Sequence, residues 1–295
     1  MRKRIIIFIP AYNAETTILD TLKAVDEAIL HYGVEIPVIV VNDCSTDKTG
    51  LVIQSFVEVK TYFIYEENSE NRGERGTIEY YFEELRLQYD WVFLIHADDI
   101  PKKEWISTMA KVISDVNDSE YFTVWSSYDN LLHENGKIIG GDNQGDIVMN
   151  NWTPKDAANF LAKITASYHV SGAAINLKLY FQIGGFKAFL QQYGDSVFYA
   201  SGILKGYKDV YIRQTLTYYR IIKSSVSFVS KRTNRDIKEI IYIIDTFSSI
   251  LTPYHIKKIK SFARNLLIRR FVKSMLSLNF VFMWNNFKWI IRLGI

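Results

Sequence analysis

The sequence predicts an α/β fold, in which an open and mostly parallel sheet is flanked by helices and followed by a helical, basic C-terminal extension. Short runs of β-branched residues alternate with segments whose apolar residues recur at helical spacing. Polar residues follow several of these runs, and basic residues gather near the end of the chain. The 295 residues are 48% hydrophobic and 23% charged, which is typical of a globular protein and excludes a mostly disordered one.

The first elements are predicted to form a strand–helix–strand unit. Ile5–Ile9 and Pro37–Val41 are short apolar runs, typical of strands that are buried on both faces. Between them, residues 15–31 carry an apolar residue every three or four positions, which predicts a helix. A right-handed crossover and parallel pairing are expected for such a unit.

Strands and helices continue to alternate along the next part of the chain. Strands are predicted at Tyr62–Tyr65, Trp91–Ile95 and Tyr121–Ser126, and helices at Gly76–Tyr89 and Lys102–Val116. After Tyr128 the pattern loosens, but a hairpin turn at 133–137 and a helix beginning at Thr153 and Pro154 are predicted from their turn and capping residues. A helix at Asp195–Lys205 and strands at Val210–Ile212 and Leu216–Tyr219 complete the domain, which we expect to span residues 1–230.

Residues 231–295 are predicted to form a separate helical extension, with Pro253 dividing one helix from the next. They hold 13 of the 35 Lys and Arg residues but 3 of the 32 Asp and Glu residues, so the extension is strongly basic. Such an asymmetry favours an acidic partner surface, either lipid headgroups or nucleic acid.

The single cysteine, Cys44, excludes an intramolecular disulfide and a cysteine-rich zinc site, and it favours a reducing compartment. The apolar run after the basic N-terminus ends at Pro10, which makes it too short for the core of a signal peptide. We therefore expect a cytoplasmic protein.

Polar residues follow three predicted strands, at 10–15, 42–47 and 96–99. In open α/β sheets, ligands bind beyond the carboxyl ends of the strands. The adjacent carboxylates of Asp98 and Asp99 repel each other unless a divalent cation such as Mg²⁺ or Mn²⁺ lies against them. The alternative is that one of them caps the helix that follows Pro101.

The segments "PAYN", "VNDCSTD" and "HADD", in this order and spacing, resemble the family 2 glycosyltransferases, which have the nucleotide-sugar-binding GT-A fold. The resemblance covers roughly residues 4–227. It includes "SGAAINLKLYFQIGGF", "YGDSVFYASGILKGYK" and "YYRIIKSSVS", which are similar to later segments of that family.

The resemblance implies a donor-binding role for residues after the first two strands. Pro10, Ala11, Tyr12 and Glu15 would line the pocket for the nucleobase and ribose. Asp43 would accept a hydrogen bond from the base, and a buried carboxylate suits an imide N–H such as that of uracil. The alternatives are ordinary packing for Tyr12 and a turn cap for Asp43.

The resemblance also implies roles for the remaining charged residues. Asp98 would hold the ribose or the metal, and Asp99 would ligate the metal that bridges the diphosphate. Asp195 would be the general base that takes a proton from the acceptor hydroxyl, unless it only starts a helix. Arg75, at a predicted helix N-terminus, would neutralise diphosphate charge, unless it lies in a solvated loop.

Two positions depart from the family pattern. His96 stands where the family often has Asp, and its imidazole would be a neutral hydrogen-bonding group, a metal ligand or a contact to ribose. Gly194 stands where the family commonly has Glu, so Asp195 keeps its place but loses an acidic neighbour.

The reaction implied by the resemblance is sugar transfer with inversion, from a nucleotide-diphosphate sugar to a saccharide or lipid-linked saccharide acceptor, as in surface polysaccharide or glycolipid assembly. A divalent cation, Mn²⁺ or Mg²⁺, would assist it. A nucleotidyltransferase is an alternative, but "IPAYNAE" is neither glycine-rich nor basic, as a triphosphate signature would be. A nucleic-acid-binding protein is another, but the basic tail holds no recognisable module and no nucleic acid is expected. A third is a catalytically inactive binding protein of the same fold.

Residues 254–292 interleave basic and apolar side chains. Polar residues interrupt the last apolar run, so we expect a helix at the membrane interface, with Trp284, Phe287 and Trp289 at headgroup depth. This predicts a peripheral location at the inner face of the membrane. The alternatives are a helix packed on the catalytic domain and a homodimer surface.

The acceptor is expected to contact the region 128–170, where no motif identifies its ligands. Four aromatic residues are candidate acceptor contacts, with core or loop packing as the alternative: Trp125, Trp152, Tyr168 and His169.

Overall fold

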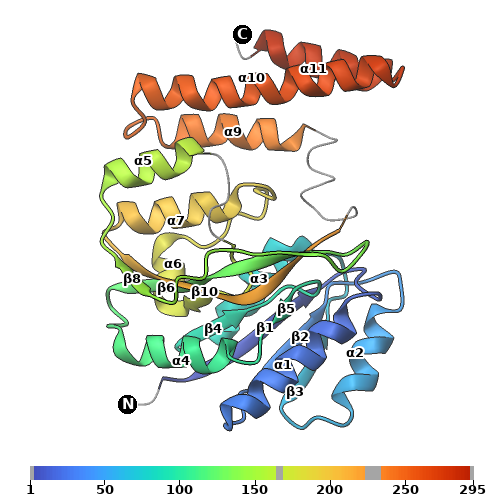
Figure 1. The fold of residues 1–295 in the computed structure, drawn as a ribbon, viewed down its shortest axis with the longest axis vertical. Helices are drawn as coiled ribbons and strands as arrows, with labels where there is room; N and C mark the ends of the chain where they lie inside the picture. The colour runs from blue at the N-terminus through green and yellow to red at the C-terminus, as the bar shows by residue number, and fades with distance from the viewer. Residues whose placement is uncertain (1–2, 164–168, 223–233, 293–295) are drawn as a thin grey trace.

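The structure is a computed structural model that describes residues 3–163, 169–222 and 234–292 (Figure 1). Its strands are β1 (Ile5–Ala11), β2 (Val38–Asn42), β3 (Phe63–Glu67), β4 (Trp91–Leu94), β5 (Ile100–Pro101), β6 (Tyr121–Leu132), β7 (Ile138–Ile139), β8 (Ile147–Asn150), β9 (Ala174–Asn176) and β10 (Lys208–Ile221). Its helices are α1 (Ile18–Tyr32), α2 (Thr49–Val57), α3 (Gly73–Leu85), α4 (Trp105–Asp115), α5 (Pro154–Lys163), α6 (Leu177–Ile183), α7 (Gly194–Leu204), α9 (Arg235–Thr246), α10 (Pro253–Leu276) and α11 (Phe280–Arg292).

The described strands form one sheet in the order β3-β2-β1-β4-β9-β6-β10-β5, with β7 beside β6 and β8 beside β10. Strands β1 to β4 are parallel, as the predicted strand–helix–strand unit requires, and β9 runs antiparallel to both of its neighbours. After β1 the chain forms β2 on one side of β1, and it later forms β4 on the other side of β1. The strand order therefore reverses between β1 and β4, which is where open α/β sheets bind ligands.

Helices cover both faces of the sheet (Figure 1). On β1, Ile7 and Ile9 face the core under α1, α2 and α4, whereas Ile6 and Phe8 face the core under α3, α6 and α7. This alternation explains why the run Ile5–Ile9 is apolar at every position: both faces of the strand are buried. The α/β fold class is confirmed.

The hairpin predicted at residues 133–137 is confirmed, since β6 and β7 pair antiparallel across it and Gly136 has a left-handed backbone (φ 66°). The two strands predicted at 210–212 and 216–219 are one strand, β10, whose pairing with β6 is irregular between Ile212 and Thr217. The patterns do not predict α2, α6, β5, β8 or β9. The strands β5, β8 and β9 have at most four residues, and helix α6 has 7. Segments this short do not show the repeat of apolar residues from which a strand or a helix is predicted.

The C-terminal helices form a further layer on top of α5 and α7 (Figure 1). Ile240 and Ile243 of α9 and Ile259 of α10 belong to the same buried cluster as Leu161 of α5 and Val197 of α7. The expected domain boundary near residue 230 lies outside the described residues, which resume at residue 234.

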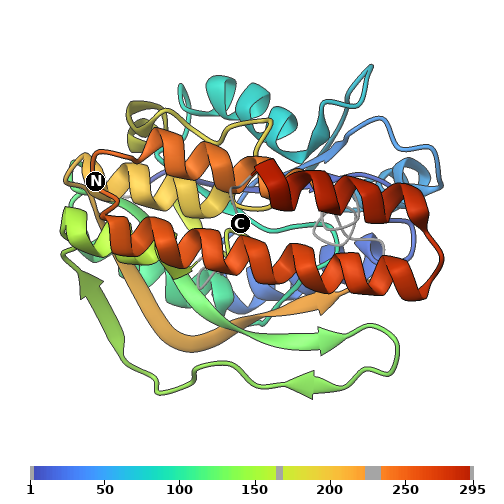
Figure 2. The same ribbon diagram turned by 90° about the horizontal axis from the view of Figure 1, so that it is seen from above.

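Helices α10 and α11 run antiparallel, side by side, across the outside of this layer (Figure 2). Pro253 begins α10, as predicted, and Thr252 caps it by accepting a hydrogen bond from the backbone of His255. The chain turns at Leu278, and Asn279 Oδ1 accepts from Phe282 N at the start of α11. Among the helices formed by described residues, none is both long and apolar enough to cross a membrane.

Candidate active site

The loops that follow β1 and β2 are hydrogen-bonded to each other at the carboxyl edge of the sheet. Asn13 N donates to Ser45 Oγ at 3.0 Å, and Ala14 N donates to Thr49 Oγ1 at 2.7 Å. Glu15, predicted as a donor ligand, accepts from Lys48 N at 3.0 Å and so helps to join the loops. These contacts build a rigid rim beside the point where the strand order reverses.

The other residues predicted to line the donor pocket lie on this rim. Pro10 and Ala11 are buried at the end of β1, with Ala11 paired to Asn42 at the end of β2. The side chain of Tyr12, just beyond them, is 50% exposed, so ordinary core packing does not account for it.

Asp43 presents one carboxylate oxygen that no group of the described residues occupies. Its Oδ1 accepts from Asn68 Nδ2 at 2.7 Å and from Arg72 N at 2.9 Å. Its Oδ2 is buried and has no hydrogen-bond partner in the parts of the chain that are described. Since the whole residue is 1% exposed, this oxygen is a strong acceptor for a ligand N–H group.

Asp99 lies with two histidines in a group of potential metal ligands. Nitrogen or oxygen atoms of His96, Asp99 and His169 all lie within 4.8 Å of one another. Asp99 Oδ1 accepts from Arg220 N at 3.0 Å, which anchors this carboxylate to β10. His169 packs its ring against Tyr219 on the same strand, with ring centroids 4.3 Å apart.

Charge is unevenly distributed over this group. Burial and the charge of Asp98 raise the pKa of Asp99 to about 7. For His96, burial disfavours the charged ring, but Glu74, Asp99 and Asp98 outweigh it and raise the pKa to about 9. Burial, followed by the charge of His96, lowers the pKa of His169 to about 4, so this ring is neutral and free to act as a ligand.

A divalent cation fits this donor set. Two imidazoles and one carboxylate suit a transition metal such as Mn²⁺ better than Mg²⁺, which prefers oxygen ligands alone. A cation bound here would displace the proton of His96, because a ligating imidazole must be neutral. Asp98 is half-buried and lies outside this group of three, but its charge acts on both His96 and Asp99.

Arg75 and Asp195 form a largely buried ion pair beside the metal-ligand group. Arg75 is in the first turn of α3, and its guanidinium donates to Asp195 Oδ1 at the start of α7. The guanidinium also lies over the ring of Phe186, 4.4 Å from its centroid. Its Nη1 is buried without a hydrogen-bond partner among the described residues. Arg75 is therefore not in a solvated loop.

The close approach of Arg75 explains why residue 194 is a glycine. A Cβ atom there would lie 3.3 Å from Cζ and Nε of Arg75, which is tighter than ordinary van der Waals contact. The glycine therefore leaves room for the guanidinium beside Asp195.

Sequence reasoning missed Glu74, which connects the two halves of the site. Its Oε1 lies 3.3 Å from His96 Nε2 and 4.0 Å from Arg75 Nε. Although burial opposes it, the charges of His96 and Arg75 hold the pKa of Glu74 well below its usual range. The signal available in the sequence is an acidic residue at a helix N-terminus, but that pattern is common at solvated helix starts. His169 is placed here as well, whereas Tyr168 lies outside the described residues.

The two tryptophans considered as acceptor contacts pack around a different carboxylate. Trp125 Nε1 donates to Asp209 Oδ2 at 2.6 Å, and Trp152 Nε1 donates to Asp209 Oδ1. Trp125 is fully buried, so the packing alternative describes it better than ligand contact.

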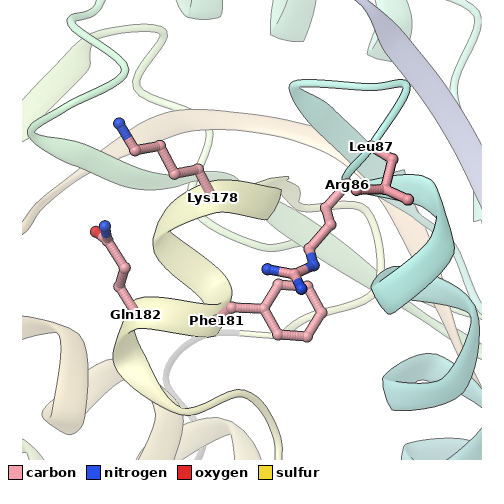
Figure 3. Close-up of a pocket in the computed structure, with 5 residues that line it drawn as sticks. All are labelled: Arg86, Leu87, Lys178, Phe181 and Gln182. Atoms are coloured by element: carbon pink, nitrogen blue, oxygen red, sulfur yellow. The ribbon is translucent and has the colours of Figure 1, made fainter.

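A separate pocket lies between the end of α3 and α6 (Figure 3). It is lined by Arg86, Leu87, Lys178, Phe181 and Gln182. Because α3 runs from Gly73 to Leu85, this pocket is roughly 18 Å along the helix from Arg75 and does not belong to the candidate active site.

Comparison with known proteins identifies relatives of this chain. A family model described as "Glycosyl transferase family 2" matches residues 6–184. "Glycosyltransferase GlyA" of Streptococcus pneumoniae serotype 4 is 27% identical over 238 residues, which cover 77% of this chain and 32% of that protein. The chain thus spans about a third of the length of the curated relative it matches.

Solved structures share the fold. S. aureus TarS 1–349 in complex with UDP-GlcNAc has a TM-score of 0.62 at 14% identity, covering 96% of this chain and 89% of that one. The mannosyltransferase PcManGT from Pyrobaculum calidifontis, in complex with GDP-Man and Mn²⁺, has a TM-score of 0.59 at 16% identity, covering 100% and 85%. The expected GT-A type of fold is confirmed by these similarities.

Proposed function

Because the chain belongs to glycosyl transferase family 2, we propose that it transfers a sugar, with inversion, from a nucleotide-diphosphate donor to an acceptor hydroxyl. The observation that carries the proposal is the meeting of two groups at the strand-order reversal. One is the set of potential metal ligands His96, Asp99 and His169, and the other is the largely buried pair of Arg75 and Asp195. Glu74 touches both.

The donor base is proposed to lie against Asp43. The unpartnered Oδ2 of Asp43 would accept an imide N–H of the base, as uracil offers, while Oδ1 stays bonded to Asn68 and Arg72. Pro10, Ala11, Tyr12 and Glu15 would form the rim around base and ribose. The UDP-GlcNAc bound to TarS and the GDP-Man bound to PcManGT support a donor of this class.

A divalent cation is proposed at Asp99, with His96 and His169 as further ligands and Asp98 at the ribose or the metal. When bound, it would offset the charge that grows on the leaving diphosphate. The Mn²⁺ in the PcManGT complex supports this choice of ion. Arg75, whose Nη1 has no partner in the described chain, would donate to the diphosphate as well.

Asp195 is proposed as the general base. Its carboxylate would take the proton of the acceptor hydroxyl while that oxygen bonds to the anomeric carbon. The bond from this carbon to the diphosphate oxygen breaks on the opposite face, and the diphosphate leaves with the electron pair. One displacement of this kind inverts the configuration and requires no covalent enzyme intermediate.

Two variants test this assignment, provided that the wild type transfers a sugar from a nucleotide-sugar donor. For Asp195→Asn we expect loss of transfer with donor affinity unchanged in a calorimetric titration, because Asn cannot accept the proton. For Asp99→Asn we expect weaker Mn²⁺ binding in the same titration, together with loss of transfer. Full turnover in either variant would show that the corresponding role is wrong.

The acceptor is proposed to be a saccharide or lipid-linked saccharide in surface polysaccharide or glycolipid assembly, with the protein held at the inner face of the membrane. The support is the outer face of the α10–α11 hairpin, defined here as its exposed apolar residues. They are Ile268, Val272, Met275, Leu276, Leu278, Phe280, Val281, Trp284, Phe287 and Ile291. No acidic residue follows Asp245, whereas nine Lys and Arg residues do. Apolar surface on helices whose charged residues are all basic suits an anionic bilayer.

A further inference from the structure

Helix α9 of the C-terminal extension reaches the segment that carries the proposed base. Glu239, on α9, is 2% exposed and points at the backbone immediately before α7. Its Oε1 accepts from Gln191 N at 2.8 Å and from Gln192 N at 3.2 Å. Its Oε2 accepts from Gln192 N at 2.9 Å and from Tyr193 N at 2.8 Å. One carboxylate thus binds three successive N–H groups.

These three residues directly precede Gly194 and Asp195. Successive backbone N–H groups form a concave site for an anion, and here the anion is a side chain of the same protein. Tyr193, the residue before α7, gives the helix no side-chain cap, and Glu239 adds a second negative charge at this end beside that of Asp195. Hydrogen bonds from N–H groups to an ionised carboxylate are stronger than those between neutral groups, and three of them fix the path of the backbone.

Asp195 is therefore held from two sides. Arg75 binds its carboxylate, and Glu239 binds the backbone two to four residues before it. Tyr193 is also buried in the apolar cluster that α7 shares with α9 and α10. A shift of α9 would move the start of α7, and with it the carboxylate of Asp195.

We infer that Glu239 is a positioning residue for Asp195, and that the C-terminal extension is thereby part of the catalytic apparatus. The inference rests on the proposed function, in which Asp195 is the general base. The extension differs from the rest of the chain in its strongly basic composition. It is nevertheless expected to be needed for turnover, even with an acceptor that is soluble in water.

The test compares Glu239→Gln with Asp236→Asn. The first variant places an amide N–H₂ against backbone N–H donors, so at least one of the three hydrogen bonds is lost. The second removes a buried charge three residues away on the same helix, where it pairs with Arg270 and makes no hydrogen bond to the segment 191–193 that the structure shows. It is the control for general damage to the extension.

For Glu239→Gln we expect kcat to fall by about tenfold to a hundredfold, since a small misplacement of a reacting group has effects of this size. The donor KM and the donor affinity should stay within about twofold, because the hydrogen bonds of Glu239 go to residues 191–193 and to none of the residues proposed to bind the donor. Asp236→Asn should keep kcat within about twofold at a temperature at which both variants are folded. An unchanged kcat in Glu239→Gln, or an equal loss in Asp236→Asn, would overturn the positioning role.

Hydrogen exchange of the wild-type protein provides a measurement that needs no variant. The amides of Gln191, Gln192 and Tyr193 should be protected as strongly as those of α9, because they bond to a side chain on that helix. Fast exchange at these three amides would refute the inference even if Glu239→Gln fails to fold.

The variant Asp195→Asn separates the two proposals. If Asp195→Asn keeps full turnover, the proposed base is wrong and the role of Glu239 is wrong with it. If Asp195→Asn is inactive while Glu239→Gln is fully active, only the positioning role is wrong.

Discussion

At the scale of single residues, the buried carboxylates of this protein differ by what surrounds them. Asp43 receives neutral N–H groups on one oxygen only, whereas Asp195 is paired with an arginine. Asp99 shares its surroundings with two histidines and a second aspartate. These differences suit the three roles proposed above: recognition of a base by Asp43, acceptance of a proton by Asp195 and ligation of a cation by Asp99.

The free oxygen of Asp43 leads to a prediction about donor binding. In Asp43→Asn, the amide oxygen must face Asn68 and Arg72, so the N–H₂ group replaces Oδ2 and opposes the N–H of the base. We expect the affinity for uridine diphosphate with Mn²⁺ to fall by about tenfold to a hundredfold, with little change in the free energy of unfolding. Isothermal titration measures the first and urea unfolding the second. Unchanged affinity would mean that the base does not contact Asp43.

Asp209 leads to a prediction about pH and stability. Burial raises its pKa to about 6, although Asn150, Trp125 and Trp152 donate hydrogen bonds to it. A carboxyl group in the unfolded chain titrates near 3.9. Below about pH 4 the carboxyl group of Asp209 is protonated in both the folded and the unfolded protein, so its ionisation costs no stability. Between about pH 4 and pH 6 the unfolded chain releases this proton while the folded protein keeps it, so the wild type loses roughly 3 kcal/mol, and the loss is complete once the pH has risen through 6.

Asp209→Asn cannot ionise and should lack this loss. Between pH 4 and pH 7, the free energy of unfolding of the wild type should therefore fall by roughly 3 kcal/mol relative to that of the variant. Urea unfolding at a series of pH values checks this. Parallel pH profiles for the two proteins would contradict it.

At the scale of helices and strands, helix starts bring the reactive groups together. Glu74 and Arg75 belong to the first turn of α3, and Asp195 to the first turn of α7. Both helices begin at the sheet edge where β1 and β4 end, so their N–H groups and positive dipole ends point toward the place proposed for the diphosphate. The C-terminal helices extend this arrangement, because α9 binds the segment before α7.

A buried polar contact joins α9 to α10. Arg270 Nη1 lies 2.9 Å from Asp236 Oδ1 and 2.8 Å from Asn234 Oδ1, and both charged side chains are buried. For Asp236→Ala we expect a loss of about 3–5 kcal/mol in the free energy of unfolding, because Arg270 stays buried without its partner charge. Urea unfolding measures this loss.

The exposed Asp245 on the same helix provides the control, since Asp245→Ala should change the free energy of unfolding by less than about 0.5 kcal/mol. The double variant Asp236→Ala with Arg270→Met should recover part of the stability. A loss below about 1 kcal/mol in Asp236→Ala would show that the pair does not hold the two helices together.

At the scale of the whole molecule, the two sides of the C-terminal layer differ. Its inner side is packed into the core formed with α5 and α7, and Trp289, expected at headgroup depth, packs against that core instead. Its outer side is the apolar face of the α10–α11 hairpin, where Trp284 stacks on Phe287 and Lys288 lies over the ring of Trp284. The alternative of a helix packed on the catalytic domain therefore describes the inner side of the layer, and the proposed membrane contact concerns the outer side alone.

The outer face of the α10–α11 hairpin leads to a prediction about membrane binding. The protein should sediment with vesicles that contain anionic phosphatidylglycerol, and salt should weaken this binding because the attraction is electrostatic. The triple variant Leu278→Ser, Phe280→Ser and Trp284→Ser should bind at least about tenfold more weakly, since it removes exposed apolar side chains.

The control replaces exposed apolar residues on other surfaces, with Leu30→Ser, Leu51→Ser and Val59→Ser, and should bind as the wild type does. Equal sedimentation of both triple variants would rule out this face as the membrane contact. A dimer that the first triple variant alone converts to a monomer, without any binding to vesicles, would identify the face as an interface between copies.

The sequence by itself determined the α/β class, the order of the first strands and the residues at their ends. It could do so because strand and helix periods are local, and because polar residues after a buried strand must lie at the edge of the sheet. It also identified Asp43, Asp99, Arg75 and Asp195 as candidates, although each candidate alone had an ordinary structural alternative.

Only the tertiary structure decided which of these residues meet. Arg75 pairs with a residue 120 positions away, His169 joins Asp99 through the packing of β10, and Glu239 binds amides 46 to 48 positions before it. The orientation of the C-terminal extension, with one side buried and the other exposed, was likewise open. Such contacts depend on how whole helices and strands pack against each other. The sequence around one residue does not show which residues far along the chain will lie next to it.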